Sequence, residues 1–233
     1  MLESARMSKL RAKKIKLILF DVDGVLTDGK IWIVPVPAVG QLSVLEASAR
    51  QSPKPQLDGP SSSPPGNLPD SNQPSGDGST FYRAFNLIEA KGFHAHDGTA
   101  FSLARMAGIK TGFITKRISE TVALRARDLK IDHVYQGKQD KLTVFQEIIE
   151  KEGITAAEAA FVGDDVIDVP VMRKCGFAVA VKNARPEVKE QAHWVTSHAG
   201  GDGAARDAIE YILKAQGKWK SVVEDYVSER SPK

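Results

Sequence analysis

Apolar residues follow two alternating patterns along this chain. Short apolar runs rich in β-branched and aromatic residues alternate with segments whose apolar residues recur every three or four positions, as in an amphipathic helix. The strand-like runs lie at residues 17–20, 110–115, 133–137, 159–165, 177–181 and 193–197, and the helix-like segments at 99–108, 118–129, 138–153, 169–176, 185–192 and 203–219. Such alternation predicts an α/β protein, a Rossmann-like three-layer sandwich with a central parallel sheet.

One long stretch interrupts the alternation. Residues 30–36 (KIWIVPV) predict a strand, and residues 81–93 are apolar enough to pair back with it. The composition changes from residue 35, and between residues 51 and 79 Pro, Ser, Gly, Asn and Asp dominate, a composition that buries too little apolar surface to offset the entropy of ordering. We therefore expect one domain at 15–220 with a mostly disordered insertion at 35–80, a basic N-terminal arm at 1–14 and a C-terminal tail at 221–233.

The composition is that of an ordinary globular protein. The formal net charge of +3 over 233 residues is too small to indicate nucleic-acid binding. The single cysteine, Cys175, excludes an internal disulfide and is typical of a reducing compartment. No apolar run is long enough to cross a membrane, and the first residues lack the cleavage pattern of a secretory signal. We expect a cytoplasmic protein that binds neither nucleic acid nor membrane.

Candidate chemistry begins where the first apolar run ends. Residues 17–20 predict a buried strand, and Asp21, Asp23 and Gly24 follow it directly. Open α/β sheets bind ligands at the carboxyl ends of their strands, and residues two apart on an extended chain point to the same side. Two crowded carboxylates favour a hard cation such as Mg²⁺. The alternative is a turn in which both aspartates only cap the following loop.

Later strand ends also carry polar side chains. Thr115 closes the run at 110–115, and Lys141 begins the helix after 133–137. A second acidic cluster lies at the end of the run at 159–165 and comprises Asp164, Asp165 and, one turn further on, Asp168. Taken singly, the threonine is explained as a helix N-cap, the lysine as a surface residue and the acids as helix caps. Together with the first two aspartates, they would meet at one edge of a parallel sheet and supply what phosphoryl transfer requires.

In order and spacing, DVDGVLTDG, FITKR, Lys141 and GDDVID resemble the four motifs of the haloacid dehalogenase superfamily of phosphohydrolases. More narrowly, VYQGKQDK, FVGDDVIDVPVM and AGGDGAARDAIEYILKAQGKW are similar to the bacterial 3-deoxy-D-manno-octulosonate 8-phosphate phosphatases. The resemblance covers residues 16–219 apart from the insertion. It implies the fold of that superfamily without a large cap domain. The activity it implies is Mg²⁺-dependent hydrolysis of a phosphomonoester through an aspartyl-phosphate, in lipopolysaccharide sugar biosynthesis.

The resemblance also implies a role for each catalytic residue. Asp21 would attack phosphorus, and Asp23 would protonate the leaving oxygen and then activate water. Asp164 would bind Mg²⁺ together with the Asp21 carboxylate and the Asp23 backbone carbonyl. Thr115 and Lys141 would hold the phosphoryl oxygens. The remaining acids of the second cluster, Asp165 and Asp168, would orient the lysine or metal-bound water.

The substrate contacts implied by the resemblance depart from the family in part. The implied positions are Asp23, His94, His96, Asp97, Gly98, Arg117, Arg125 and Lys141. This chain has His96 and Ser102 where the family has arginines, and Lys116 where it has glycine. Because arginine binds a carboxylate in bidentate fashion, these changes bear on which sugar acid is bound. A nine-carbon 2-keto sugar-acid 9-phosphate is therefore the nearest alternative substrate.

Family members of this kind use a β-hairpin after the first motif to form a tetramer whose neighbouring subunits close the site. The corresponding hairpin here is 30–34 paired with 84–93, with the insertion at its tip in place of the family's short turn. The resemblance thus implies a homotetramer. Two other classes stay open: a non-catalytic assembly domain, like that fused to some sugar-acid cytidylyltransferases, and a phospho-receiver domain. The presence of both first-motif aspartates disfavours the former, and a lysine that precedes the second acidic cluster disfavours the latter.

Overall fold

The computed structural model describes residues 2–37 and 85–230, which form two compact units. One unit is Trp32–Ala90, and the other contains the described chain up to Ile31 and from Lys91 onward. The larger unit contains a parallel sheet and every aspartate of the predicted site.

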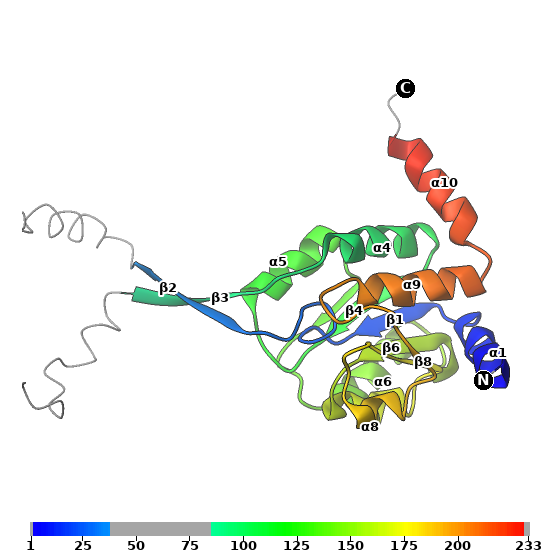
Figure 1. Cartoon of the computed structure of the whole chain (residues 1–233), viewed down its shortest axis with the longest axis horizontal. Helices are drawn as coiled ribbons and strands as arrows, with labels where there is room; N and C mark the ends of the chain where they lie inside the picture. Colours follow the sequence, from blue (N-terminus) through cyan, green and yellow to red (C-terminus); the bar gives the residue numbers. More distant parts are fainter. Residues whose placement is uncertain (1, 38–84, 231–233) are drawn as a thin grey trace, which may run out of the picture. The chain divides into compact units, whose positions relative to one another are not determined.

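A six-stranded sheet lies at the centre of the larger unit (Figure 1). Its strands are β1 Leu17–Phe20, β4 Lys110–Ile114, β5 His133–Tyr135, β6 Ala159–Gly163, β7 Phe177–Ala180 and β8 Trp194–Val195. The order is β5-β4-β1-β6-β7-β8, and every neighbouring pair is parallel, as predicted. Strands β1, β6 and β7 are buried along their whole length, which explains why their sequences are continuous apolar runs.

Helices cover both faces of this sheet (Figure 1). On one face lie α4 Ala95–Met106, α5 Glu120–Leu129 and α9 Ala204–Ala215, and on the other α6 Lys141–Lys151 and α8 Pro186–Lys189. The short helix α7 Val169–Met172 packs against α6, and two 3₁₀ turns are η1 Ala156–Glu158 and η2 Val166–Asp168. From β1 the chain builds outward through β4 to β5, and then outward in the opposite direction from β6 to β8. The reversal beside β1 is a topological switch point, where open α/β sheets bind their ligands.

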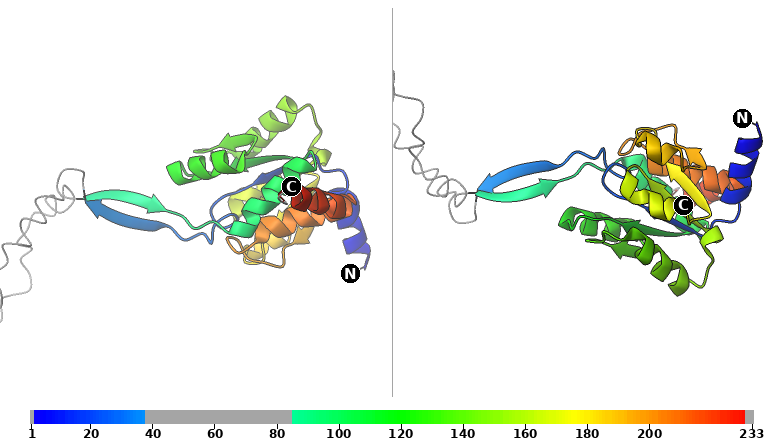
Figure 2. Two further views of the ribbon diagram at one scale, coloured as in Figure 1. Left: turned by 90° about the horizontal axis from the view of Figure 1, so that it is seen from above. Right: turned by 90° about the horizontal axis from the view of Figure 1, so that it is seen from below.

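Both ends of the described chain are helical, which the sequence pattern did not predict. The expected N-terminal arm contains α1 Leu2–Ala12, in which Ser8 and Ala12 are buried. The expected C-terminal tail belongs to α10 Trp219–Arg230, which packs beside α4 and α9 (Figure 2). The predicted helix at 203–219 therefore ends at Ala215, and a second helix follows it. In both terminal helices the buried face is narrow, so the charged residues dominate the sequence pattern and conceal it.

The smaller unit contains a two-stranded antiparallel hairpin. Strand β2 (Trp32–Pro37) pairs with β3 (Phe85–Ala90), so the predicted pairing is confirmed. Strand β2 includes residues 35–37, which the composition had assigned to the insertion, because a two-stranded ribbon has outer edges where proline loses no hydrogen bond. The rest of the predicted insertion, residues 38–80, lies outside the described residues. The hairpin side chains include exposed apolar ones, with Trp32 57% and Leu87 59% exposed.

Aromatic packing links β1 to its neighbours in the core of the larger unit. The Phe101 ring on α4 lies 5.1 Å from that of Phe20 and 5.6 Å from that of Phe113, both in edge-to-face contact. Such pairs add to the energy of apolar burial and hold β1 against its covering helix. Cys175 is a buried free thiol. None of the described helices combines the length and apolar character needed to cross a membrane.

Candidate active site

The carboxyl ends of β1, β4 and β6 meet at one cavity. Strand β1 pairs with β4 on one side and β6 on the other, so Asp21, Thr115 and Asp164 follow three adjacent strands. The cavity has a volume of about 410 Å³ and is lined by Asp21, Asp23, Gly29, Thr115, Lys116, Arg117, Lys141, Asp164, Asp165 and Ile167. The structure thus brings together the residues that the motifs predicted to be catalytic and metal-binding.

Lys141 lies buried between two carboxylates. It is the first residue of α6, and its side chain is 2% exposed. Its Nζ lies 2.8 Å from Asp21 Oδ2 and 2.7 Å from Asp168 Oδ1. Burial alone lowers the pKa of Lys141, but the two carboxylates outweigh it and the pKa is raised. Lys141 is therefore a stable cation beside Asp21 and not an exposed surface lysine.

Asp168 holds Lys141 and the acidic loop in place. Its side chain is completely buried, and Oδ1 accepts a hydrogen bond from Lys141. Its Oδ2 accepts the backbone N–H groups of Asp164 and Asp165 at 3.0 and 3.3 Å. Because both oxygens are engaged, Asp168 orients the lysine and the acidic loop and is not free to act as a ligand. Asp165 caps η2, since its Oδ1 accepts the backbone N–H of the next residue at 2.7 Å.

Asp21 and Asp164 fit a divalent cation. Carboxylate oxygens of Asp21, Asp164 and Asp168 lie within 4.8 Å of one another. Among the described residues, buried Asp164 Oδ1 has no hydrogen-bond partner, so this oxygen is available to a cation. A Cβ on Gly24, whose φ is +90°, would lie 2.1 Å from Asp164 Oδ2. Only glycine at this position allows the two motifs to approach so closely, and oxygen ligands in this arrangement suit Mg²⁺.

The acidity of these two carboxyls supports the same fit. Burial raises the pKa of Asp21 to about 7; Asp168 adds to the rise, while Lys141 opposes it. Burial likewise raises the pKa of Asp164 to about 8, and repulsion from Asp21 and Asp168 adds to it. Fully ionised, the cluster would hold more negative charge than one lysine balances, and a divalent cation would offset this excess.

Thr115 presents a hydroxyl to the cavity. It follows β4, is 2% exposed, and its backbone N–H donates to the Tyr135 carbonyl at 2.9 Å. Its Oγ1 accepts the backbone N–H of Arg117 at 3.3 Å. The N-cap position of the following helix α5 belongs to Ser119. The explanation of Thr115 as a helix cap is therefore wrong.

Two cations face the carboxylate of Asp23. Lys91 Nζ lies 2.5 Å from Asp23 Oδ1, and Arg117 Nε lies 3.8 Å from Oδ2. Arg117 was predicted near the substrate, and it lines the cavity. Lys91 was not predicted, because a lysine just after a strand carries no sequence signal that separates it from ordinary surface lysines. Only the fold shows that its side chain is fully buried.

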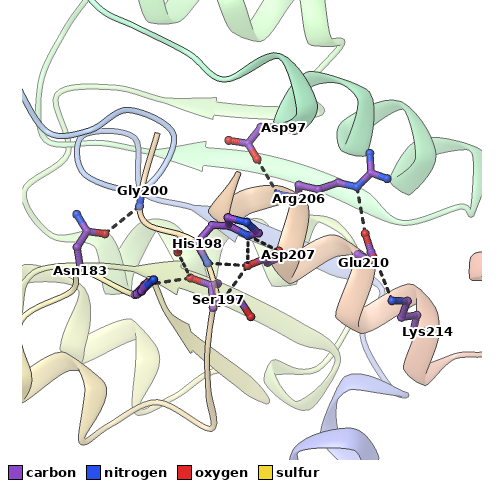
Figure 3. A network of polar contacts seen from close by, with 11 residues as sticks. Asp97, Asn183, Ser197, His198, Gly200, Arg206, Asp207, Glu210 and Lys214 are labelled. Atoms are coloured by element: carbon purple, nitrogen blue, oxygen red, sulfur yellow. Dashed lines mark hydrogen bonds and ion pairs between the residues drawn. The ribbon is translucent and has the colours of Figure 1, made fainter. Parts of the chain in front are cut away.

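The other predicted substrate contacts form a separate cluster. They are His94, His96, Asp97, Gly98 and Arg125, and none of these five described residues lines the cavity. Asp97 Oδ1 accepts the backbone N–H of Arg206 at 2.7 Å (Figure 3), and burial raises the Asp97 pKa. The Arg125 guanidinium lies 5.6 Å from the centre of the Phe93 ring. The structure therefore gathers these residues at the start of α4 and on α5.

A glycine-rich loop before α9 supports the turn that carries Asp23. Asp207 Oδ2 accepts the backbone N–H groups of Ser197 and His198 at 2.8 and 2.9 Å, which fixes this loop (Figure 3). A Cβ on Gly200 would lie 1.7 Å from the carbonyl oxygen of Gly24. The loop therefore contacts the first-motif turn closely enough that no side chain fits between them.

Comparison with known proteins agrees with this geometry. A model of the haloacid dehalogenase-like hydrolases matches residues 111–207, which run from β4 into α9. With a relative 34% identical over 89% of the chain, the family is established: this protein belongs to the haloacid dehalogenase-like hydrolases. The resemblance indicated by the four motifs is confirmed.

Within that family, similarity extends to particular enzymes. The chain is 34% identical over 208 residues to 3-deoxy-D-manno-octulosonate 8-phosphate phosphatase KdsC of Escherichia coli, covering 89% of this chain and 84% of the relative. The Yersinia pestis phosphatase of the same name superposes with a TM-score of 0.69 at 29% identity, over 92% of this chain and 89% of that one. The Moraxella catarrhalis enzyme, solved with magnesium, phosphate and KDO, gives 0.69 at 28% identity, over 94% and 97%.

Proposed function

We propose that this protein is a Mg²⁺-dependent phosphatase that converts 3-deoxy-D-manno-octulosonate 8-phosphate to 3-deoxy-D-manno-octulosonate and phosphate, a step of lipopolysaccharide sugar biosynthesis. The observation that carries the proposal is the position of Asp21. Its carboxylate lies 2.8 Å from buried Lys141, in one cavity with Asp23 and Asp164. Support for the substrate comes from the names of the relatives, including a structure that contains KDO and phosphate.

The chain's own residues account for both chemical steps. The Val22 backbone N–H donates to Asp21 Oδ1 at 2.7 Å, and with Lys141 on Oδ2 it holds this carboxylate in one orientation for attack on phosphorus. As the bond to the leaving oxygen breaks, Asp23 gives that oxygen a proton. Asp23 then takes a proton from the water that attacks the aspartyl-phosphate, so phosphate leaves and Asp21 is restored. Lys141 and Thr115 hold the phosphoryl oxygens.

The proposal includes a bound Mg²⁺. Asp21 and Asp164 would hold it through their carboxylates, and Asp23 through its backbone carbonyl. When bound, the cation neutralises negative charge on the phosphoryl group. Support comes from the unpartnered Asp164 oxygen, from the raised pKa of both carboxyls and from the magnesium in the Moraxella relative.

We further propose that Arg117, together with the cluster of His94, His96, Asp97, Gly98 and Arg125, recognises the sugar acid. Arg117 lines the cavity and carries the charge that a carboxylate requires. In the cluster, three buried polar atoms lack a hydrogen-bond partner among the described residues: His94 Nδ1, Asp97 Oδ2 and Arg125 Nε. Unpaired buried groups of this kind are costly unless a ligand or water satisfies them.

We also propose a cytoplasmic homotetramer. The exposed apolar residues of the hairpin, among them Trp32, Ile33 and Leu87, support association with further copies of the chain. The buried free thiol of Cys175 supports a reducing compartment.

Phosphate release tests the proposed activity. Purified protein with Mg²⁺ is assayed on octulosonate 8-phosphate, nine-carbon sugar-acid 9-phosphates and simple sugar phosphates, with Asp21→Asn as the control. We expect preference for the octulosonate ester and no turnover by the variant. Preference for a nine-carbon ester would contradict the substrate, and no turnover of any ester would favour a non-catalytic assembly domain.

A further inference from the structure

The buried side chain of Lys91 contacts Asp23, the predicted acid–base residue. Lys91 follows β3, its side chain is 0% exposed, and its Nζ lies 2.5 Å from Asp23 Oδ1. Lysine is almost never fully buried without a charged partner, because taking an ammonium group out of water carries a large desolvation cost. An exposed pair such as Lys110–Asp132, with side chains 52% and 27% exposed, carries no such cost.

The two oxygens of Asp23 have different surroundings. Asp23 lines the cavity, but Lys91 is not among the residues that do, so the ammonium group contacts Oδ1 from outside the cavity lining. The other oxygen, Oδ2, lies 3.8 Å from Nε of Arg117, which does line the cavity. The carboxylate is thus held with Oδ1 toward Lys91 and Oδ2 toward the space where a substrate would bind.

We propose that Lys91 is a positioning residue for Asp23. It engages Oδ1 and thereby fixes Oδ2 as the atom that exchanges the proton. This inference rests on the proposed phosphatase activity. When Asp21 bonds to phosphorus and the phosphorus–oxygen bond breaks, the leaving oxygen keeps the electron pair and takes the proton from Oδ2. In the second step, Oδ2 recovers a proton from the attacking water. Lys91 takes no part in the proton transfer and does not touch the substrate.

This role predicts a dependence on the leaving group. An aliphatic sugar alcohol is a poor leaving group and needs the proton from Asp23, whereas a nitrophenolate leaves without one. Loss of a group that only positions Asp23 should therefore slow hydrolysis of the sugar ester much more than hydrolysis of the aryl ester. A lysine that merely stabilises the fold would, when removed, lower both rates by the same factor.

The test compares kcat/KM for octulosonate 8-phosphate and para-nitrophenyl phosphate in full-length protein with Mg²⁺. For Lys91→Met we expect the sugar-ester kcat/KM to fall about 10²-fold, because general acid catalysis typically contributes at least about 10²-fold. The aryl-ester kcat/KM should change by less than about 10-fold, because its leaving group needs no proton. Asp23→Asn should show the same selective loss, and Lys91→Arg, which keeps the charge, should recover most of the sugar-ester rate. Lys110→Met is the matched control, because it removes a lysine–aspartate pair at the amino end of β4.

Equal losses on both esters in Lys91→Met would overturn the positioning role while leaving the phosphatase proposal intact. If Lys91→Met does not fold, Lys91→Gln, which also removes the charge, gives the same comparison. Wild-type protein that hydrolyses neither ester would instead refute the proposed function itself, so the two failures are distinguishable.

Discussion

At the residue scale, the site depends on one buried lysine between acidic groups. Replacing Lys141 by Met leaves Asp21 and Asp168 without their shared cation. Removing one partner of a buried ion pair is strongly destabilising, so we expect the free energy of unfolding to fall by about 3 kcal/mol. Phosphatase activity should fall by about 10²- to 10³-fold, because the phosphoryl oxygens lose a charged donor.

Urea denaturation and phosphate release measure the two effects of Lys141→Met. Lys138→Met is the control, since Lys138 is exposed in the loop before the same helix. If Lys141→Met were as stable and as active as Lys138→Met, the result would contradict the role of Lys141 as the cation that the site depends on.

The carboxyls predict how stability depends on pH when no metal is present. In the folded protein the pKa of Asp21 is raised from 3.8 to about 7, and that of Asp164 to about 8, chiefly by burial. A carboxyl whose pKa is raised on folding binds its proton more tightly in the folded state. Its contribution is therefore favourable at low pH and is lost as pH rises from about 4 to about 8.

Urea denaturation in the presence of a chelator, at about pH 5 and about pH 9, checks this prediction. Asp164→Asn should stabilise the metal-free protein at the higher pH and have less effect at the lower one. Adding Mg²⁺ should stabilise the wild type at the higher pH but not the variant. A wild type with the same pH dependence as Asp164→Asn would contradict the crowding of negative charge.

How well single residues could be predicted depends on how local their signal is. Asp21 and Asp164 directly follow fully buried strands, so the neighbouring sequence places them at the edge of the sheet. Lys91 has no such signal, because its burial depends on a tertiary contact with Asp23. The substrate-contact cluster at the start of α4 was predicted only from the family resemblance, and its residues do not line the cavity in the structure.

At the element scale, the order of strands and helices was predictable because burial on both faces makes each central strand a continuous apolar run. The terminal helices α1 and α10 were missed for the opposite reason. Each buries few residues, such as Ser8 and Ala12 in α1, so local composition predicts solvated segments. The pairing of β2 with β3 was predicted from β-branched and aromatic residues, but the paired strand was expected to end at residue 34 because the change of composition from Pro35 onward was assigned to the insertion.

The loop before α9 gives a prediction about packing between elements. A Cβ on Gly200 would lie 1.7 Å from the Gly24 carbonyl oxygen, so Gly200→Ala must displace the first-motif turn. We expect a loss of about 2 kcal/mol in stability, as for other overpacked sites, and a fall in kcat as Asp23 moves. Gly92→Ala is the control for stability, since nothing lies within 4 Å of its Cβ position. Equal denaturation midpoints for the two variants would contradict this prediction, because they would show that the loop accommodates the extra methyl group without loss of stability.

At the scale of the whole molecule, the exposed hairpin predicts association. Trp32 and Leu87 are more than half exposed, at 57% and 59%, and lie on paired strands. In the proposed homotetramer these side chains would be buried, so Trp32→Glu combined with Leu87→Glu should give a smaller species in sedimentation velocity. Met7→Glu, at an exposed position on α1, is the control. A monomeric wild type would contradict the proposal.

The central claim is that Asp21 carries the phosphoryl group during turnover. The most direct measurement quenches the protein during turnover of octulosonate 8-phosphate, reduces it with borohydride and locates the product by peptide mass spectrometry. Borohydride converts an aspartyl-phosphate to homoserine, and we predict this change at Asp21 and at no other aspartate. Homoserine at Asp23 or Asp164 would contradict the assignment, and an enzyme that turns over without any reduced residue would contradict the covalent route.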